Sequence, residues 1–193
     1  MSRDPLIERA VDRLLGEMAP PTSLLDDPGF RKWFDGSRVV DRRGNPLVVY
    51  HGTGAKFSVF DRTDDIGFHF ATDPSPAKDA ASWSKQRGSG EVRRYVLRIV
   101  KPATAADWCT DEPEELYDQL RRDGFITRNV PQGELSKARE DDKLFYSLIR
   151  NLLGEGGYDG LYYKNEVEYG NAYVAFDAKQ ILPLDLSVHE ATR

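Results

Sequence analysis

Apolar residues recur at helical spacing near the start of the chain. Residues 4–18 read DPLIERAVDRLLGEM, in which Asp4 can cap a helix and Pro5 suits its first turn. The apolar positions that follow this spacing are Leu6, Ile7, Ala10, Val11, Leu14, Leu15 and Met18. The pattern predicts an amphipathic helix, which either packs on its own domain or docks on a partner protein.

Short runs of β-branched and aromatic residues predict strands over the rest of the chain. The clearest run is EVRRYVLRIV at 91–100, where apolar residues partly alternate with charged ones and Pro102 is expected to stop the strand. A hairpin is predicted over 38–53, with RRGN as its turn. Shorter strands are predicted at 67–73, 158–165, 171–177 and 180–186.

Separate helices are predicted between these strands. Their ranges are 26–36, 74–90, 112–124 and 134–153. Hairpins, separate helices and closely spaced late strands together favour an α+β fold with a mainly antiparallel sheet. We expect one domain at 26–193, preceded by a helical extension at 1–25.

Composition narrows the function classes. The 193 residues carry a net charge of −5, so the chain as a whole is not suited to nucleic acid, although one basic groove would reverse this. One cysteine and three histidines make a structural metal site unexpected, and no metal is predicted. No apolar run has the length of a membrane span, so no membrane contact is predicted. The first residues do not resemble a secretory signal, which favours a cytoplasmic protein or one delivered to a target cell by a signal-free route.

The predicted strand at 46–53 ends on His51, Gly52 and Thr53, an unusual end for a strand that only fills a core. His51 is either a buried structural histidine, a metal ligand or a group that positions a ligand. A metal site at His51 would need further ligands, and the other two histidines, His69 and His189, lie in unrelated parts of the sequence. Gly52 lets a ligand approach the backbone, and the N–H and C=O of a strand edge together match a carboxamide.

Four segments in order resemble a known family. They are RKWFDGSRVVDRRGNPLVVYHGT at 31–53, GFHFATDPSPAKDA at 67–80, GYDGLYY at 157–163 and NAYVAFDAKQI at 171–181. The set resembles the mono-ADP-ribosyltransferases of phage and bacterial polyvalent proteins, which are similar to the clade of diphtheria toxin and poly(ADP-ribose) polymerases. The resemblance covers about 28–184 and is poor at 103–150.

The resemblance implies the split β-sheet of ADP-ribosyltransferases, with NAD as a consumed substrate. It implies that His51 holds a hydroxyl of the adenosine ribose and that Gly52 grips the nicotinamide carboxamide, with Thr53 completing the motif. An aromatic strand that carries His69 and Phe70 is then expected to pack against the nicotinamide ring. A second aromatic group from the following helix stacks on the other face in the family.

Two positions of the NAD site depart from the family pattern in a tolerable way. His69 replaces a tyrosine, and an imidazole can still pack against a ring. The second stacking position falls on Ala80, where Trp83, one helical turn later, either substitutes or is an ordinary core tryptophan.

The serious departure is Ala172. The family pattern there is glutamate, which binds the 2′-hydroxyl of the nicotinamide ribose and stabilises the positive charge of the transition state. A methyl group does neither, so the chain as given should be nearly inactive. Three explanations stay open: a silenced variant of an enzyme that harms its host, a natural pseudoenzyme, or another carboxylate, such as Glu166 or Glu168 of NEVEYG, in the same role.

The sequence therefore predicts an NAD-dependent mono-ADP-ribosyltransferase, acting as a toxin or effector and impaired by Ala172. The alternatives are a pseudoenzyme that binds NAD or a partner, and an NAD glycohydrolase with water as acceptor. The acceptor of a transferase is a macromolecule, protein or nucleic acid, which the sequence does not identify. The predicted helix at 4–18 is where an antitoxin or other partner protein would dock.

Overall fold

The structure is a computed structural model that describes residues 19–53, 60, 65–75, 77, 91–106, 112–165 and 170–184. Several sequence predictions lie outside these residues. They are the helix at 4–18, most of the helix at 74–90, the stacking positions Ala80 and Trp83, and the carboxylates Glu166 and Glu168. The proposed boundary between an extension and a domain at residue 25 stays a prediction.

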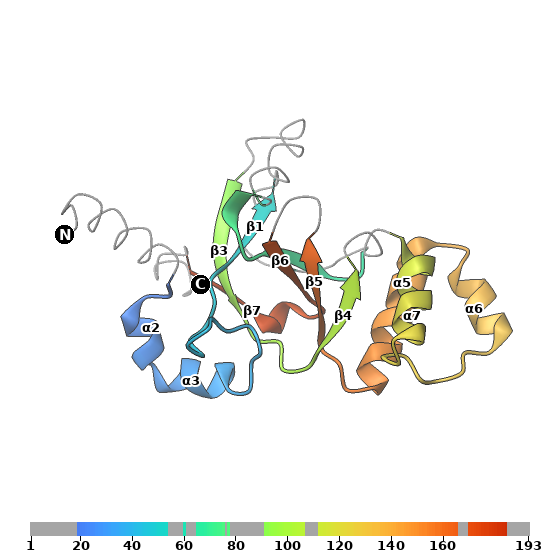
Figure 1. Ribbon diagram of the computed structural model, residues 1–193, viewed down its shortest axis with the longest axis horizontal. Helices are drawn as coiled ribbons and strands as arrows, with labels where there is room; N and C mark the ends of the chain where they lie inside the picture. Colours follow the sequence, from blue (N-terminus) through green and yellow to red (C-terminus); the bar gives the residue numbers. More distant parts are fainter. Residues whose placement is uncertain are drawn as a thin grey trace, which may run out of the picture.

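The described strands form one seven-stranded sheet in the order β4-β5-β6-β2-β1-β3-β7 (Figure 1). Its strands are β1 Val49–Thr53, β2 Phe68–Ala71, β3 Glu91–Leu97, β4 Pro102–Ala106, β5 Gly160–Asn165, β6 Gly170–Ala175 and β7 Ile181–Pro183. All neighbours pair antiparallel except β4 and β5, which are parallel. The predicted α+β fold with a mainly antiparallel sheet is confirmed.

Strand β4 was not predicted. Pro102 was expected to stop the strand at 91–100, but β3 ends earlier, at Leu97, and Pro102 begins β4. Proline is tolerated there because it is the first residue of a strand at the edge of the sheet.

Two groups of helices flank the sheet. Figure 1 shows α2 and α3 on one side and α5, α6 and α7 beyond the β4 edge. Their bounds are α2 Thr22–Asp26, α3 Pro28–Phe34, α5 Pro113–Arg122, α6 Gln132–Ala138 and α7 Asp142–Glu155, with a short 3₁₀ helix, η3, at Ala178–Gln180. The single helix predicted over 134–153 is two helices, because the Asp141 carboxylate accepts a hydrogen bond from the Lys143 N–H at 2.7 Å and starts α7 anew.

Each face of the sheet has its own apolar core. On one face, α5 and α7 pack over inward-facing residues of β4, β5 and β6. Those strand residues are Ala103, Ala105, Leu161, Tyr163, Ala172 and Val174. On the other face a second cluster gathers Val49, Phe70, Tyr95, Leu97 and Tyr173. The alternation of strand residues between the two clusters fixes which side chains share a face.

Gly67, which precedes β2, is a sensitive position in this packing. A Cβ atom added there would lie 2.5 Å from Val174 Cγ1 and 2.6 Å from the Ala175 carbonyl oxygen. We expect Gly67→Ala to lower the free energy of unfolding by about 2–3 kcal/mol, because the β2–β6 backbone must shift. Chemical denaturation measures this.

Gly133→Ala is the matched control. A Cβ atom at this position in α6 meets nothing within 4 Å. Alanine there should be neutral or stabilising by up to about 1 kcal/mol through helix propensity. Equal destabilisation by the two substitutions would contradict the packing assigned to Gly67.

Candidate active site

His51 lies on β1 beside the seam between β1 and β2. Within the described residues these strands pair only at Tyr50 and Ala71, whereas β1 and β3 pair along their full length from Val49 to Thr53. A short seam flanked by longer pairings is what a dividing sheet requires. The His51 ring bridges this seam, because its Nδ1 lies 2.8 Å from the main-chain oxygen of His69 on β2.

The surroundings of His51 favour its neutral form. Its ring contacts those of Phe60, Phe70 and Tyr95, with centroid distances of 5.2, 5.4 and 6.4 Å. Burial lowers the pKa of His51 below its usual 6.5, and the positive charge of a protonated His69 would lower it further. Because Nδ1–H donates to a carbonyl oxygen, Nε2 is the acceptor nitrogen of the neutral ring. An acceptor there is compatible with the hydroxyl that the sequence resemblance leads us to expect at this histidine.

The lowered pKa of His51 should make folding sensitive to mild acid. The unfolded chain binds a proton near pH 6.5, while the folded chain binds it only at lower pH, so the free energy of unfolding falls as the pH drops below 6.5. We expect a larger loss between about pH 7.5 and pH 5.5 for the chain as given than for His51→Gln, which does not titrate. Urea unfolding at the two pH values measures both losses. Equal losses would contradict a buried neutral His51.

His69 belongs to a polar cluster on the face of the sheet opposite to that of the His51 ring. Its Nδ1 lies 3.2 Å from the Tyr163 hydroxyl on β5, and its Nε2 lies 3.3 Å from Asp65 Oδ2, an ion-pair distance when the ring is protonated. Burial alone would raise the pKa of Asp65, but His69 and the Ile66 N–H together lower it. Asp65 also accepts a hydrogen bond from Arg150 on its main-chain oxygen. The cluster therefore holds the His69 ring in a fixed orientation.

Asp65 and Tyr163 are site residues that the sequence prediction missed. GYDGLYY at 157–163 was singled out as one of the four segments of the resemblance, but Tyr163 was not named as a site residue. The strand alternation that turns Tyr163 to the His69 face was a usable signal, since Leu161 and Tyr163 share that face.

Ala172 lies on β6 between two neighbours. It is opposite Ala71 of β2 and opposite Tyr163 of β5, and it is 3% exposed. Opposite residues of antiparallel strands share a face, so a longer side chain at position 172 would start beside the Tyr163 ring and two residues along β2 from His69, on the same face. The hydroxyl and imidazole there are suitable partners for a carboxylate.

The structure places the predicted NAD-site residues that it describes on three neighbouring strands, β1, β2 and β6. Their side chains do not all lie on one face of the sheet. Tyr50 shares the face of Ala71 and Ala172, so His51, the next residue, leaves the opposite face of β1. Phe70 is 1% exposed and packs beside His51, away from His69. Gly52 shares the face of Tyr50, and Thr53 is buried on the His51 face.

The part of the chain that the structure describes contains neither a cluster of metal ligands nor a membrane-spanning helix. No three histidine, cysteine, aspartate or glutamate side chains gather there as a metal site would require. No described helix is both long and apolar enough to cross a bilayer.

Comparisons with known proteins define the class. A profile of the family described as ADP-ribosyltransferase in polyvalent proteins matches residues 41–185, a span that includes every described strand. The fold and this match identify an ADP-ribosyltransferase. More particularly, the chain belongs to the family of ADP-ribosyltransferases in polyvalent proteins. ADP-ribosyltransferases take NAD as their substrate.

The other comparisons add little. No curated protein matches the chain. The crystal structure of an anti-CRISPR protein resembles it over 70% of this chain and 93% of that one, with 11% identity and a TM-score of 0.33. A likeness at this level supports nothing about function.

Proposed function

We propose that the chain is a mono-ADP-ribosyltransferase whose NAD site lies at the ends of β1, β2 and β6. The adjacency of three motif strands carries this proposal. β6, β2 and β1 are consecutive in the sheet and hold Ala172, His69 and His51, and the His51 ring contacts the β2 main chain at 2.8 Å. Residues about 120 positions apart in the sequence are thus drawn to one end of the sheet, as a ligand site shared by separate strands requires.

The proposed reaction is a substitution at the nicotinamide ribose. The bond between C1′ and the nicotinamide nitrogen breaks, and its electron pair leaves with neutral nicotinamide. A nucleophile of the acceptor then forms a new bond to C1′ and releases its proton. The transition state resembles an oxocarbenium ion, so a nearby negative charge stabilises it.

Three of the predicted residues have roles in this scheme. His51 accepts a hydrogen bond from a hydroxyl of the adenosine ribose through its neutral ring. Gly52 pairs with the carboxamide through its main chain, and His69, held by Asp65 and Tyr163, packs against the nicotinamide. Contact of Ala80 or Trp83 with the second face of the ring stays a prediction.

Ala172 leaves the scheme without its charged group, so we propose that the chain as given is nearly inactive. An alanine at this one position is what a silenced toxin or effector would carry. The burial of Ala172, at 3% exposure, instead favours a second candidate function, a pseudoenzyme that binds NAD or a partner without turnover, because the position is filled by core packing.

Transfer of label from NAD tests the proposal. The chain and its Ala172→Glu variant are incubated with NAD labelled in the adenylate half and with a lysate of the native host. We expect label in acid-insoluble macromolecules only with the variant. Free ADP-ribose without labelled macromolecules would assign a glycohydrolase, and NAD binding without any turnover by either protein would assign the pseudoenzyme.

A further inference from the structure

A second site lies at the other end of the sheet. β1 and β3 are antiparallel, and Thr53 at the end of β1 lies opposite Glu91 at the start of β3. Arg98 follows the other end of β3 and is therefore remote from Thr53. Phe176 likewise follows the end of β6 that is remote from Ala172, roughly 13 Å along the strand at ~3.3 Å per residue. Between α3, η3 and α7 these segments enclose a groove of about 900 Å³. We call it the α3–η3–α7 groove.

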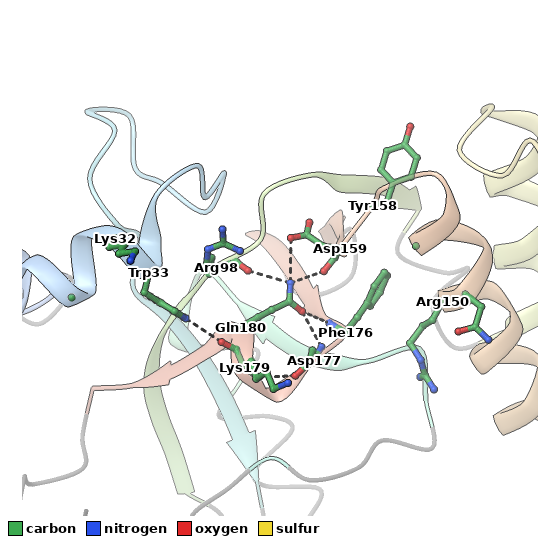
Figure 2. A pocket seen from close by; sticks show the side chains of 13 residues that line it. Lys32, Trp33, Arg98, Arg150, Tyr158, Asp159, Phe176, Asp177, Lys179 and Gln180 are labelled. Carbon is green, nitrogen blue, oxygen red and sulfur yellow. Dashed lines mark hydrogen bonds between the residues drawn. The ribbon is translucent and has the colours of Figure 1, made fainter.

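The α3–η3–α7 groove is rich in positive charge. Figure 2 shows Lys32 on one side, Arg150 on the other, and Arg98 and Lys179 between them. Among the described residues, the charged groups of Lys32, Arg98 and Lys179 make no hydrogen bond or ion pair. Lys32 and Lys179 are also exposed to solvent. These three cations are therefore available to an anionic ligand.

The two carboxylates of the groove are engaged with the main chain. Asp159 accepts hydrogen bonds from the N–H groups of Val100 and Lys101 at 2.7–3.1 Å. Asp177 accepts from the Lys179 N–H at 2.8 Å and so caps η3. Within the described residues, neither carboxylate forms an ion pair with the cations of the groove.

Aromatic rings line the same groove. The Trp33 indole is half-buried, and its Nε1–H donates to the Lys179 main-chain oxygen at 3.1 Å, which fixes the ring beside η3. Phe176 and Tyr158 contribute two further partly exposed rings. Cations beside aromatic faces are the combination that binds single-stranded nucleic acid, through phosphates and stacked bases respectively.

We propose that the α3–η3–α7 groove binds single-stranded nucleic acid. The chain carries −5 overall, so attraction for a polyanion must come from a local arrangement such as this one. An acidic polypeptide would use the cations but not the aromatic faces, which favours nucleic acid. We further assign single-stranded nucleic acid as the acceptor of ADP-ribose, and this assignment rests on the proposed transferase activity.

Fluorescence anisotropy of a labelled oligothymidylate of about 12 nucleotides tests the binding without NAD, using the full chain. The variant Lys32→Ala/Arg98→Ala/Lys179→Ala should bind at least about tenfold more weakly at low salt, and its salt slope should fall by about 2, because three phosphate contacts are lost. Trp33→Leu should weaken binding at least about fivefold and leave the salt slope unchanged, because stacking alone is lost.

The matched control removes three exposed cations elsewhere, as Arg42→Ala/Arg122→Ala/Lys137→Ala, with the same change in net charge. It should leave affinity and salt slope nearly unchanged. Equal weakening by both triple variants, or no binding by the full chain, would overturn the proposal. Displacement of the oligonucleotide by polyglutamate at equal charge concentration would also overturn it and assign the groove to an acidic polypeptide.

The acceptor step has its own readout. Label transferred by Ala172→Glu should be released by nuclease and survive protease, and the reverse pattern would overturn nucleic acid as the acceptor. Because the anisotropy measurement needs neither NAD nor turnover, failure of the transferase proposal leaves the binding result intact.

Discussion

Replacing Ala172 with glutamate is expected to raise the rate of nicotinamide release by at least about 10²–10³-fold, the usual value of one preorganised electrostatic group. The carboxylate would stabilise the positive charge that develops on the ribose as the bond to nicotinamide breaks. Its nearest polar neighbours would be the Tyr163 hydroxyl, opposite it on β5, and the His69 ring that this hydroxyl contacts at 3.2 Å. A chromatographic assay of nicotinamide measures the rate.

Ala172→Gln is the matched control for this prediction. Glutamine has nearly the same size and can make the same neutral hydrogen bonds, but it carries no charge. The variant should stay at the rate of the chain as given, and similar rates for the glutamine and glutamate variants would contradict an electrostatic role. Because position 172 is 3% exposed, thermal unfolding of both variants checks that each is folded.

Gln180→Met is expected to cause the largest loss of stability, about 3–5 kcal/mol. The Gln180 carboxamide is 9% exposed and joins four main-chain groups of three segments. Its oxygen accepts from the N–H groups of Phe176 and Asp177 at 2.9 Å, and its nitrogen donates to the main-chain oxygens of Arg98 and Asp159 at 3.1 and 2.7 Å. Methionine keeps the volume but leaves several buried polar groups unpaired, at about 1–3 kcal/mol each.

Gln132→Met controls for the chemical change itself. Gln132 is exposed at the start of α6, so the same substitution should change the free energy of unfolding by less than about 0.5 kcal/mol. Guanidinium denaturation of both variants gives the comparison. A small effect at Gln180 would contradict the stabilising role assigned to its four hydrogen bonds.

The strands that sequence reasoning located are those with strong local patterns. The run at 91–100 and the late strands at 158–165, 171–177 and 180–186 became β3, β5, β6 and β7, within a few residues. β4 was missed because PATAA is a strand through its surroundings and not through its propensity. Ala103 and Ala105 are buried below α5, and the strand pairs with β5.

Sequence reasoning named only those residues of the candidate site that belong to a recognisable sequence motif. His51 was named from the end of its strand and His69 from the family resemblance, and the His51 ring reaches the main chain of His69 across the seam. Tyr163 was not named because its contact with His69 depends on sheet order, the two being 94 positions apart in the sequence. Asp65 lies only four residues before His69, but no motif singled it out. The α3–η3–α7 groove was equally hidden, because its cations come from distant segments and form no charge run.

A crystal structure of the chain grown with NAD tests the central claim most directly, because the lack of a glutamate at position 172 should leave the substrate intact. We predict that the nicotinamide carboxamide pairs with the N–H and C=O of Gly52 and that a hydroxyl of the adenosine ribose donates to His51. NAD bound in the α3–η3–α7 groove instead, or absent from the ends of β1, β2 and β6 at saturating concentration, would contradict the claim.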